Sequence, residues 1–391
     1  MVLTRHAYKA SMNITRWLPN EVLTKIMEHS ARGDRATLCQ ISRLFHALCL
    51  PVLNRSVFLA HVDSATAFFY SILKYPERAN AVRSLTVHWA WPTAPSSLID
   101  VMLRSMKLMD MLEIFEFFGD SQVSTSCICE LLAHGRHPRL EGCEICPLFS
   151  SEEESATEKI AGDLILSFLG RHPTLKIFKF APVHYTIPIS SPEPVLLPNL
   201  VLYEGPSAIV PYLTLPRLRY AHLNWDGEQL EGDLEVRIDE IISALRSCTD
   251  PDILLGSSHK YLMRCCAQIV ASAARNMPRT RKLRMVNVQM LDERMVQGIA
   301  ATLSGFTGLL HLGIESGRAI AWTRENHHLP GFLPPTVKDR DRRAIETLGS
   351  ACATLETCCL DERAWRKVNG SWEAWNVLDF WALIGVSQYG I

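Results

Sequence analysis

The six residues LEIFEF at Leu112–Phe117 carry apolar side chains at their first, fourth and sixth positions. Because successive side chains of a strand point to opposite faces of a sheet, the alternation that ends this segment predicts a short strand. The same arrangement recurs along the 391-residue chain, with a weaker match at Leu200–Leu202. The full matches are Val82/Leu85/Val87, Leu112/Phe115/Phe117, Leu140/Cys143/Ile145, Leu175/Phe178/Phe180, Leu218/Ala221/Leu223, Leu283/Val286/Val288, Leu309/Leu312/Ile314 and Leu355/Cys358/Leu360.

Segments with helical spacing of apolar residues separate these predicted strands. Several strands also share a lead-in, which reads HPRL, HPTL, LPNL or LPRL. A strand and a helix in regular alternation predict an α/β fold in which parallel strands lie side by side with helices on the outside. The predicted helices are Ser97–Met111, Cys127–His134, Ala156–Gly170, Val236–Arg246, Tyr261–Asn276 and Asp292–Leu303.

The overall composition excludes several classes of protein. Lysine and arginine number 40 against 41 aspartates and glutamates, so no strong positive field exists to hold a nucleic acid. A hydrophobic content of 48% predicts a sizeable core. The first ten residues lack the apolar region of a signal peptide, and no window is apolar enough for a membrane span. We therefore expect reduced thiols in the cytoplasm or nucleus, with neither nucleic acid nor membrane as a partner.

Catalytic and metal-binding patterns are scarce in the sequence. We find no nucleophile elbow, phosphate loop, zinc-protease helix or dinucleotide fingerprint. The best metal candidate joins Cys127 and Cys129 to Cys143 and Cys146, because the second pair has zinc-knuckle spacing. Cys143, however, occupies an inward-facing repeat position, where a reduced cysteine behaves as a small hydrophobe. We therefore predict neither a metal nor a cofactor, and no enzymatic activity.

The C-terminal segment 362–391 is rich in tryptophan. Asn369-Gly370 between strand-like arms predicts a hairpin, since both residues accept the positive φ of a type I′ turn. This hairpin could supply an aromatic ligand patch, or it could cap the open end of the repeat array. We favour the cap. The tryptophans concerned are Trp365, Trp372 and Trp375.

The N-terminal segment 15–59 differs from the rest of the chain. It opens with LPNEVLTKI at Leu18–Ile26 and continues with a second apolar block around Ser42-Arg43 and Phe45. The order and spacing of these blocks resemble an F-box, although Phe45 stands where many members of that family have tryptophan. A helical unit of this length carries more apolar residues than it can bury alone, which predicts a partner.

The resemblance to an F-box implies docking onto a Skp-type adaptor and, through it, onto a cullin-RING ubiquitin ligase. Such docking would lay an amphipathic helical face into an apolar groove. We expect Leu23, Ile41 and Leu48 to pack inside the unit instead. The predicted adaptor-binding residues are Leu18, Pro19, Val22, Ile26, Leu38, Ser42 and Phe45.

Residues 60–361 resemble the leucine-rich-repeat-like arrays that follow the F-box in many fungal proteins. The predicted organisation is thus an N-terminal tail (1–14), an F-box (15–59), an irregular leucine-rich-repeat-like solenoid (60–361) and a C-terminal cap hairpin (362–391). The resemblance implies the substrate-recognition subunit of an SCF-type ligase, whose array binds an unidentified client protein.

The alternative is an interaction scaffold that uses the same array without recruiting a ligase. In either case we expect the client on the variable positions of the strands. Acidic residues crowd the first copies and basic ones the later copies, which predicts a dipolar face. The predicted client-binding residues are Glu113, Glu116, Glu141, Glu144, Lys176, Lys179, Arg219 and Arg284.

Overall fold

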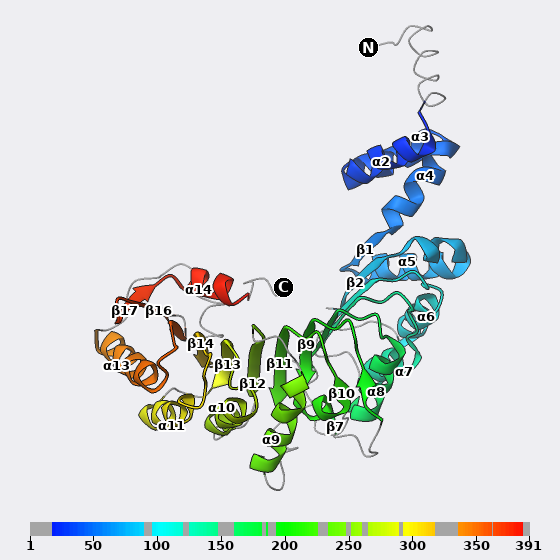
Figure 1. Ribbon diagram of the computed structural model, residues 1–391. Coiled ribbons are helices and arrows are strands. Elements are labelled where there is room, and N and C mark those ends of the chain that lie inside the picture. Colours follow the sequence, from blue (N-terminus) through cyan, green and yellow to red (C-terminus); the bar gives the residue numbers. More distant parts are fainter. Residues whose placement is uncertain are drawn as a thin grey trace, which may run out of the picture.

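The computed structural model describes residues 18–89, 96–119, 125–147, 160–181, 185–186, 193–225, 234–247, 252–259, 265–288, 292–316, 335–361 and 363–385. Within these ranges a 13-stranded sheet runs in the order β1-β2-β3-β4-β6-β9-β11-β12-β13-β14-β15-β16-β17. The sheet curves into an arch that carries helices on its convex side, and the N-terminal helices stand beyond one end (Figure 1). The predicted tail 1–14 lies outside the described residues.

Neighbouring strands pair in parallel from β1 to β15, and the last two pairings are antiparallel. An α/β fold built on a large, mostly parallel sheet is therefore confirmed. The strands are β1 Ser56–Leu59, β2 Ser84–Trp89, β3 Ile114–Gly119, β4 Gly142–Pro147, β6 Ile177–Phe180, β9 Leu202–Pro206, β11 Tyr220–Trp225, β12 Leu254–His259, β13 Lys282–Val288, β14 His311–Ser316, β15 Thr357–Leu360, β16 Arg363–Val368 and β17 Ser371–Trp375.

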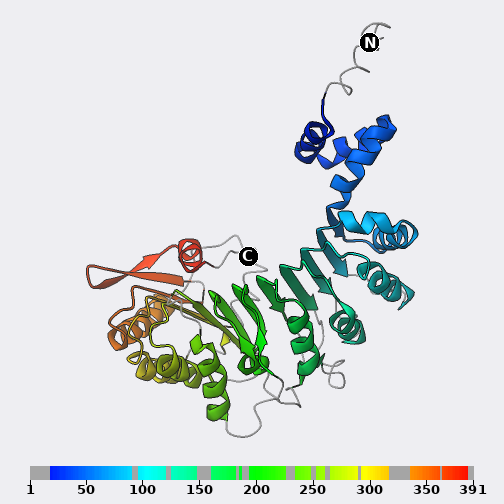
Figure 2. The ribbon, with the colours of Figure 1, turned by 45° about the vertical axis from the view of Figure 1, so that its right-hand side comes forward.

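Helices connect successive strands and cover one face of the sheet, which we call the outer face; the other is the inner face (Figure 2). Short segments add two small sheets, which pair β5 Ile160–Ala161 with β7 Tyr185–Thr186 and β8 Val195–Leu196 with β10 Leu213–Thr214. The connecting helices are α5 Val62–Lys74, η1 Pro76–Ala81, α6 Ser96–Met106, α7 Thr125–His134, α8 Gly162–Arg171, η2 Ser207–Tyr212, α9 Leu234–Ala244, η4 Leu245–Ser247, α10 Cys265–Asn276, α11 Glu293–Leu303 and α13 Pro335–Ala351.

The core lies between the outer face and these helices. The repeat pattern creates it because the last two apolar residues of each copy lie two positions apart and so share a face. The register aligns the penultimate apolar residue of one strand with that of the next, as in Leu85, Phe115, Cys143 and Phe178. All four side chains are buried in one continuous cluster that extends along the array.

Strands β12 and β13 differ from the sequence prediction. In β13 the register pairs Leu283 with Leu255 and Leu312, so Leu283 and Met285 face the core. The predicted copy Leu283/Val286/Val288 is therefore displaced by three residues, because that copy places Met285 at a variable position although its side chain is buried. The sequence does not predict strand β12, because a polar residue, Ser257, stands at one of its core-facing positions.

The shared lead-ins have a structural role on the helix side of the sheet. His137 of HPRL and His172 of HPTL are both buried, and their rings stack with centroids 6.2 Å apart. The backbone N–H of His137 donates to Nε2 of His172 at 3.1 Å, and Nδ1 of His172 lies 2.8 Å from the carbonyl oxygen of Phe168. These bonds require a neutral imidazole. Burial accordingly lowers the pKa of His172 to about 4.

The N-terminal unit comprises α2 Asn20–His29, α3 Arg32–Ile41 and α4 Arg43–Asn54. The range 15–59 predicted for an F-box thus contains three described helices and also β1, which pairs with β2 in the sheet. The helix α4 contains Pro51 in its last turn. Only Arg55 separates α4 from β1.

The C-terminal segment forms the predicted hairpin. Asn369 and Gly370 adopt φ values of 50° and 83°, and Val368 pairs with Ser371 across the turn. The ring of Trp372 packs beside Gly349 of α13, so the hairpin covers the end of the helical layer. A feature that the sequence did not predict follows: the chain turns back as α14, Val377–Ile384, toward the inner face.

Candidate functional site

The N-terminal unit has a small hydrophobic cluster of its own, separate from the core of the array. Leu23 and Met27 of α2 meet Cys49 of α4, and all three side chains are buried. Helices α3 and α4 meet at Ser42, whose Oγ accepts a hydrogen bond from the N–H of Phe45 at 3.2 Å. Ser42 is therefore the N-cap of α4, a role that stabilises the helix start.

Apart from Ser42, which is exposed and caps α4, the predicted adaptor-binding residues divide into two groups. Pro19, Val22 and Ile26 project from α2 and its N-terminus into solvent, and half of the Ile26 side chain is exposed (50%). The second group packs against the small hydrophobic cluster and is only partly exposed. This second group consists of Leu18, Leu38 and Phe45.

Two further apolar side chains of the N-terminal unit reach solvent. The sequence predicted Ile41 as internal packing, yet 63% of it is exposed at the end of α3. Leu44 on α4 is exposed as well. Helical periodicity shows which residues share an apolar face but not whether that face packs against a neighbouring helix. The prediction that Ile41 packs inside the unit is therefore wrong. Val22, Ile26, Ile41 and Leu44 are the exposed apolar set of this unit.

The predicted client-binding residues lie at two levels of the sheet. Glu113, Glu141, Lys176 and Arg219 each precede a strand by one residue, so they line the edge where the strands begin. The other four belong to the strands and lie on the inner face, toward the concavity. This second group consists of Glu116, Glu144, Lys179 and Arg284.

Cross-strand pairs neutralise much of the predicted charge separation. At the edge, Lys176 lies 2.7 Å from Glu141, and both side chains are about half exposed. On the inner face, Lys179 lies 3.1 Å from Glu144, and only 7% of the Lys179 side chain is exposed. Glu204 of β9 stands next to Lys179 in the register, and burial raises the pKa of its carboxyl group.

The far end of the inner face is covered by α14. Phe380 and Ile384 are buried against Cys359 and Ala364 of β15 and β16. The ring of Trp381 lies 5.0 Å from the guanidinium of Arg284, which forms a bidentate pair with Glu315 at 2.7 and 3.2 Å. Arg284 is thus already bound by this chain and is not presented to a client.

The described cysteines of the metal candidate do not converge on one site. Cys127 and Cys143 lie in the core, whereas Cys146 lies on the opposite, inner face of β4. Burial raises the pKa of the Cys127 and Cys146 thiols to about 12, which disfavours the thiolate that binds metal. Among the described residues, no group of three or more His, Cys, Asp or Glu side chains could hold a metal ion.

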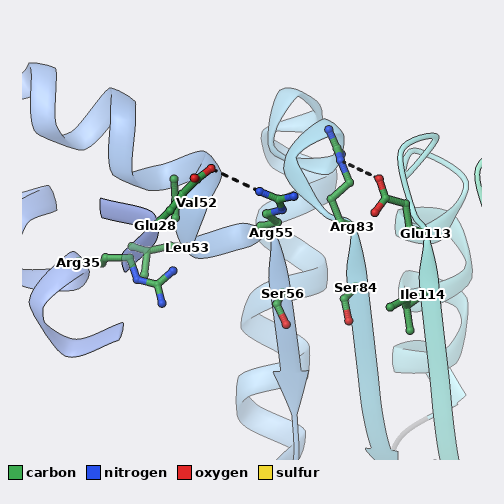
Figure 3. Close-up of a pocket in the computed structure, with 10 residues that line it drawn as sticks. All are labelled: Glu28, Arg35, Val52, Leu53, Arg55, Ser56, Arg83, Ser84, Glu113 and Ile114. Atoms are coloured by element: carbon green, nitrogen blue, oxygen red, sulfur yellow. Dashed lines mark hydrogen bonds and ion pairs between the residues drawn. The ribbon is translucent and has the colours of Figure 1, made fainter. Parts of the chain in front are cut away.

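The near end of the sheet carries a cleft of about 560 Å³ between the N-terminal unit and the first strands (Figure 3). Arginines of α3, of the α4–β1 junction and of the edge before β2 line it, together with the inner-face residues that begin β1, β2 and β3. We call it the junction cleft. Its lining residues are Glu28, Arg35, Val52, Leu53, Arg55, Ser56, Arg83, Ser84, Glu113 and Ile114.

Three aromatic rings lie on the inner face of the same strands. Phe58 of β1 packs on His88 of β2 with centroids 5.0 Å apart, and His88 packs on Phe118 of β3 at 4.7 Å. Phe58 is 53% exposed. We call these three residues the aromatic ladder. The sequence did not identify it, although the alternation in Ser56–Leu59 carries the strand signal that places Phe58 on the face opposite Val57.

Comparisons with known proteins do not assign a family. No family model and no curated protein matches the sequence. Among solved structures, the chain is similar to one described as "Crystal structure of Rad7 and Elc1 complex in yeast" at 12% identity and a TM-score of 0.36. The match covers 81% of this chain and 94% of that chain. No helix in the described ranges is both long and apolar enough to cross a membrane.

Proposed function

We propose that this protein is the substrate receptor of a cullin-RING ubiquitin ligase, with an F-box that binds a Skp-type adaptor. The observation that carries the proposal is the exposed apolar set of the N-terminal unit, Val22, Ile26, Ile41 and Leu44. These side chains lie on helices whose own cluster is separate from the core of the array. They are therefore available to a partner without disturbing the repeats.

The resemblance of Leu18–Phe45 to an F-box supports the same proposal, because the F-box-like positions Pro19, Val22 and Ile26 are exposed on α2 and its N-cap. An apolar helical face of this kind fits a hydrophobic groove in an adaptor. Truncation of one such anchor at the centre of an interface typically costs about 2–4 kcal/mol.

The array supplies the client-binding part of this proposal. Its inner face is covered by α14 at the β13–β16 end, which leaves the near end, beside the N-terminal unit, as the surface for a client. We propose a receptor without catalytic chemistry or a cofactor of its own, which acts in the cytoplasm or nucleus by holding the client beside the ligase.

Affinity purification tests the adaptor assignment. The full chain is compared with the double variant Pro19→Ala/Ile26→Ala, with thermal unfolding as a check that the array remains folded. Val236→Ala is the control, because Val236 is also a largely exposed aliphatic residue but lies on α9, far from α2 in the fold (Figure 1). We expect the double variant to lose Skp-type adaptor and cullin, and the control to keep both.

Undiminished adaptor binding by the double variant would refute the assignment. Recovery of the client without any cullin would instead favour the scaffold alternative.

A further inference from the structure

The junction cleft carries an unbalanced positive charge. Arg55 pairs with Glu28 at 3.4 Å, and Arg83 pairs with Glu113 at 3.6 Å, as the dashed lines in Figure 3 mark. Arg35 has no ion-pair partner within the described ranges, and its Nε is buried without a hydrogen-bond acceptor. The three arginines and two glutamates leave a formal charge of one positive unit, which a single carboxylate would neutralise.

The aromatic ladder supplies an apolar surface on the same strip of the sheet. Ser56 lines the cleft and Phe58 begins the ladder, so the two sites are joined by one strand. Residues two apart on a strand are separated by about 6.4–6.8 Å. An extended peptide over the inner face can therefore reach both sites with residues two to four positions apart. The exposed face of Phe58 would pack against a large apolar side chain.

The rest of the inner face favours this strip. At the opposite end of the sheet α14 lies over β14 and β15, and in the middle the side chain of Lys179 is held by Glu144. Strands β1 to β3 instead present the hydroxyl groups of Ser56 and Ser84, the half-exposed side chain of Ile114, and the carboxylate of Glu116, which accepts a hydrogen bond from Thr86 at 2.9 Å. Serine hydroxyls can bond to the backbone or the carboxylate of a bound segment.

We infer that the junction cleft and the aromatic ladder together bind an extended segment of the client in which an aspartate or glutamate lies two to four residues from a large apolar residue. Arg35 binds the carboxylate, and Phe58 binds the apolar side chain. A carboxylate is favoured over a phosphate because two carboxylates already share the cleft with the arginines, and a dianion would exceed the remaining charge. This inference rests on the proposed function, since it takes the inner face as the client site.

The test selects peptides with the immobilised full chain from a phage library of random dodecapeptides. The best selected peptide is then labelled with fluorescein, and its binding is measured by anisotropy. Arg35→Ala and Phe58→Ala are compared with Arg294→Ala, which removes an exposed arginine of α11 on the outer side of the array. We expect enrichment of the acidic-apolar spacing, at least tenfold weaker binding by the first two variants, and unchanged binding by the third. Arg35→Lys should restore part of the loss, because it keeps the charge.

Selection of peptides without an acidic position, no selection at all, or equal binding by Arg35→Ala and the wild type would each overturn the inference. A variant of the selected peptide with phosphoserine in place of its acidic residue should bind no more tightly; tighter binding would refute the carboxylate assignment. Adaptor recovery is measured with the same proteins. Pro19→Ala/Ile26→Ala should lose the adaptor and keep the peptide, whereas Phe58→Ala should lose the peptide and keep the adaptor, so failures of the two proposals remain distinguishable.

Discussion

Replacement of Phe380 by alanine should release α14 from the inner face of the sheet. Phe380 and Ile384 are the buried side chains of this helix. Full burial of a large apolar side chain contributes about 1.5–3 kcal/mol, so the two residues together hold the helix with about 3–6 kcal/mol. An isolated helix of 8 residues is not stable in water. Docking and helix formation are therefore expected to be lost together.

The magnitude follows from the removed contact. Truncation of a buried phenylalanine costs about 3–5 kcal/mol, which is comparable to the whole docking energy. Since about 1.4 kcal/mol corresponds to a factor of ten, amide exchange in Val377–Ile384 should accelerate on the order of 10²–10³-fold. Hydrogen–deuterium exchange with mass spectrometry measures this directly, while the peptides of β2 to β4 report whether the array is unchanged.

Leu378→Ala is the matched control for this measurement. Leu378 lies on the same helix, but 48% of it is exposed, whereas Phe380 is fully buried. We expect less than about a tenfold change in exchange for this variant, because little apolar contact is removed. Equal protection of α14 in the wild type and in Phe380→Ala would refute the reasoning that this side chain holds the helix on the sheet.

Three further predictions concern stability. Lys179→Met should lower the free energy of unfolding in denaturant by about 3–5 kcal/mol, because it leaves the mostly buried Glu144 without its cation. Lys176→Met, at an exposed pair, should cost less than about 1 kcal/mol, and similar losses for the two variants would contradict the prediction. The pKa of His172 is about 4 in the folded chain and 6.5 ordinarily. Its contribution to the free energy of unfolding is therefore fully present above pH 6.5, and about 3 kcal/mol is lost as the pH falls to 4. His172→Gln should reduce this loss in unfolding curves at pH 7.5 and 5, and an identical loss would argue against the histidine as its source. Gly370→Ala should cost about 1 kcal/mol of thermal stability from backbone strain alone, since φ is 83° and the new methyl group meets no neighbour; no change would show that the turn relaxes.

The apolar alternation in the sequence was sufficient to predict most of the strands. In β2, β3, β4 and β6 the core-facing positions hold large side chains such as Leu85 and Phe117, so local sequence alone reveals the pattern. The hairpin at Asn369-Gly370 was equally predictable because a two-residue turn of this composition has one favoured geometry. In these segments the information is local.

The remaining features depend on contacts between distant residues. Strand β12 was not predicted because Ser257 occupies a core-facing position, where the indole Nε1–H of Trp225 donates to its hydroxyl at 2.8 Å. A polar residue that is satisfied by a partner from another strand leaves no trace in local hydrophobicity. The same holds for the candidate site: the aromatic ladder and the position of α14 arise from tertiary packing, and neither was predicted.

The junction between α4 and β1 fixes the orientation of the N-terminal unit relative to the sheet. Arg55 alone joins the helix to the first strand, and its backbone carbonyl accepts the N–H groups of Arg83 and Ser84 at 2.9 and 3.0 Å. No flexible tether therefore intervenes where the N-terminal unit meets the sheet. In the proposed ligase, a client bound to β1 to β3 would be held at a fixed distance and orientation relative to the adaptor. Which of its lysines can be reached would then be decided by where they lie on the client, not by diffusion of the receptor.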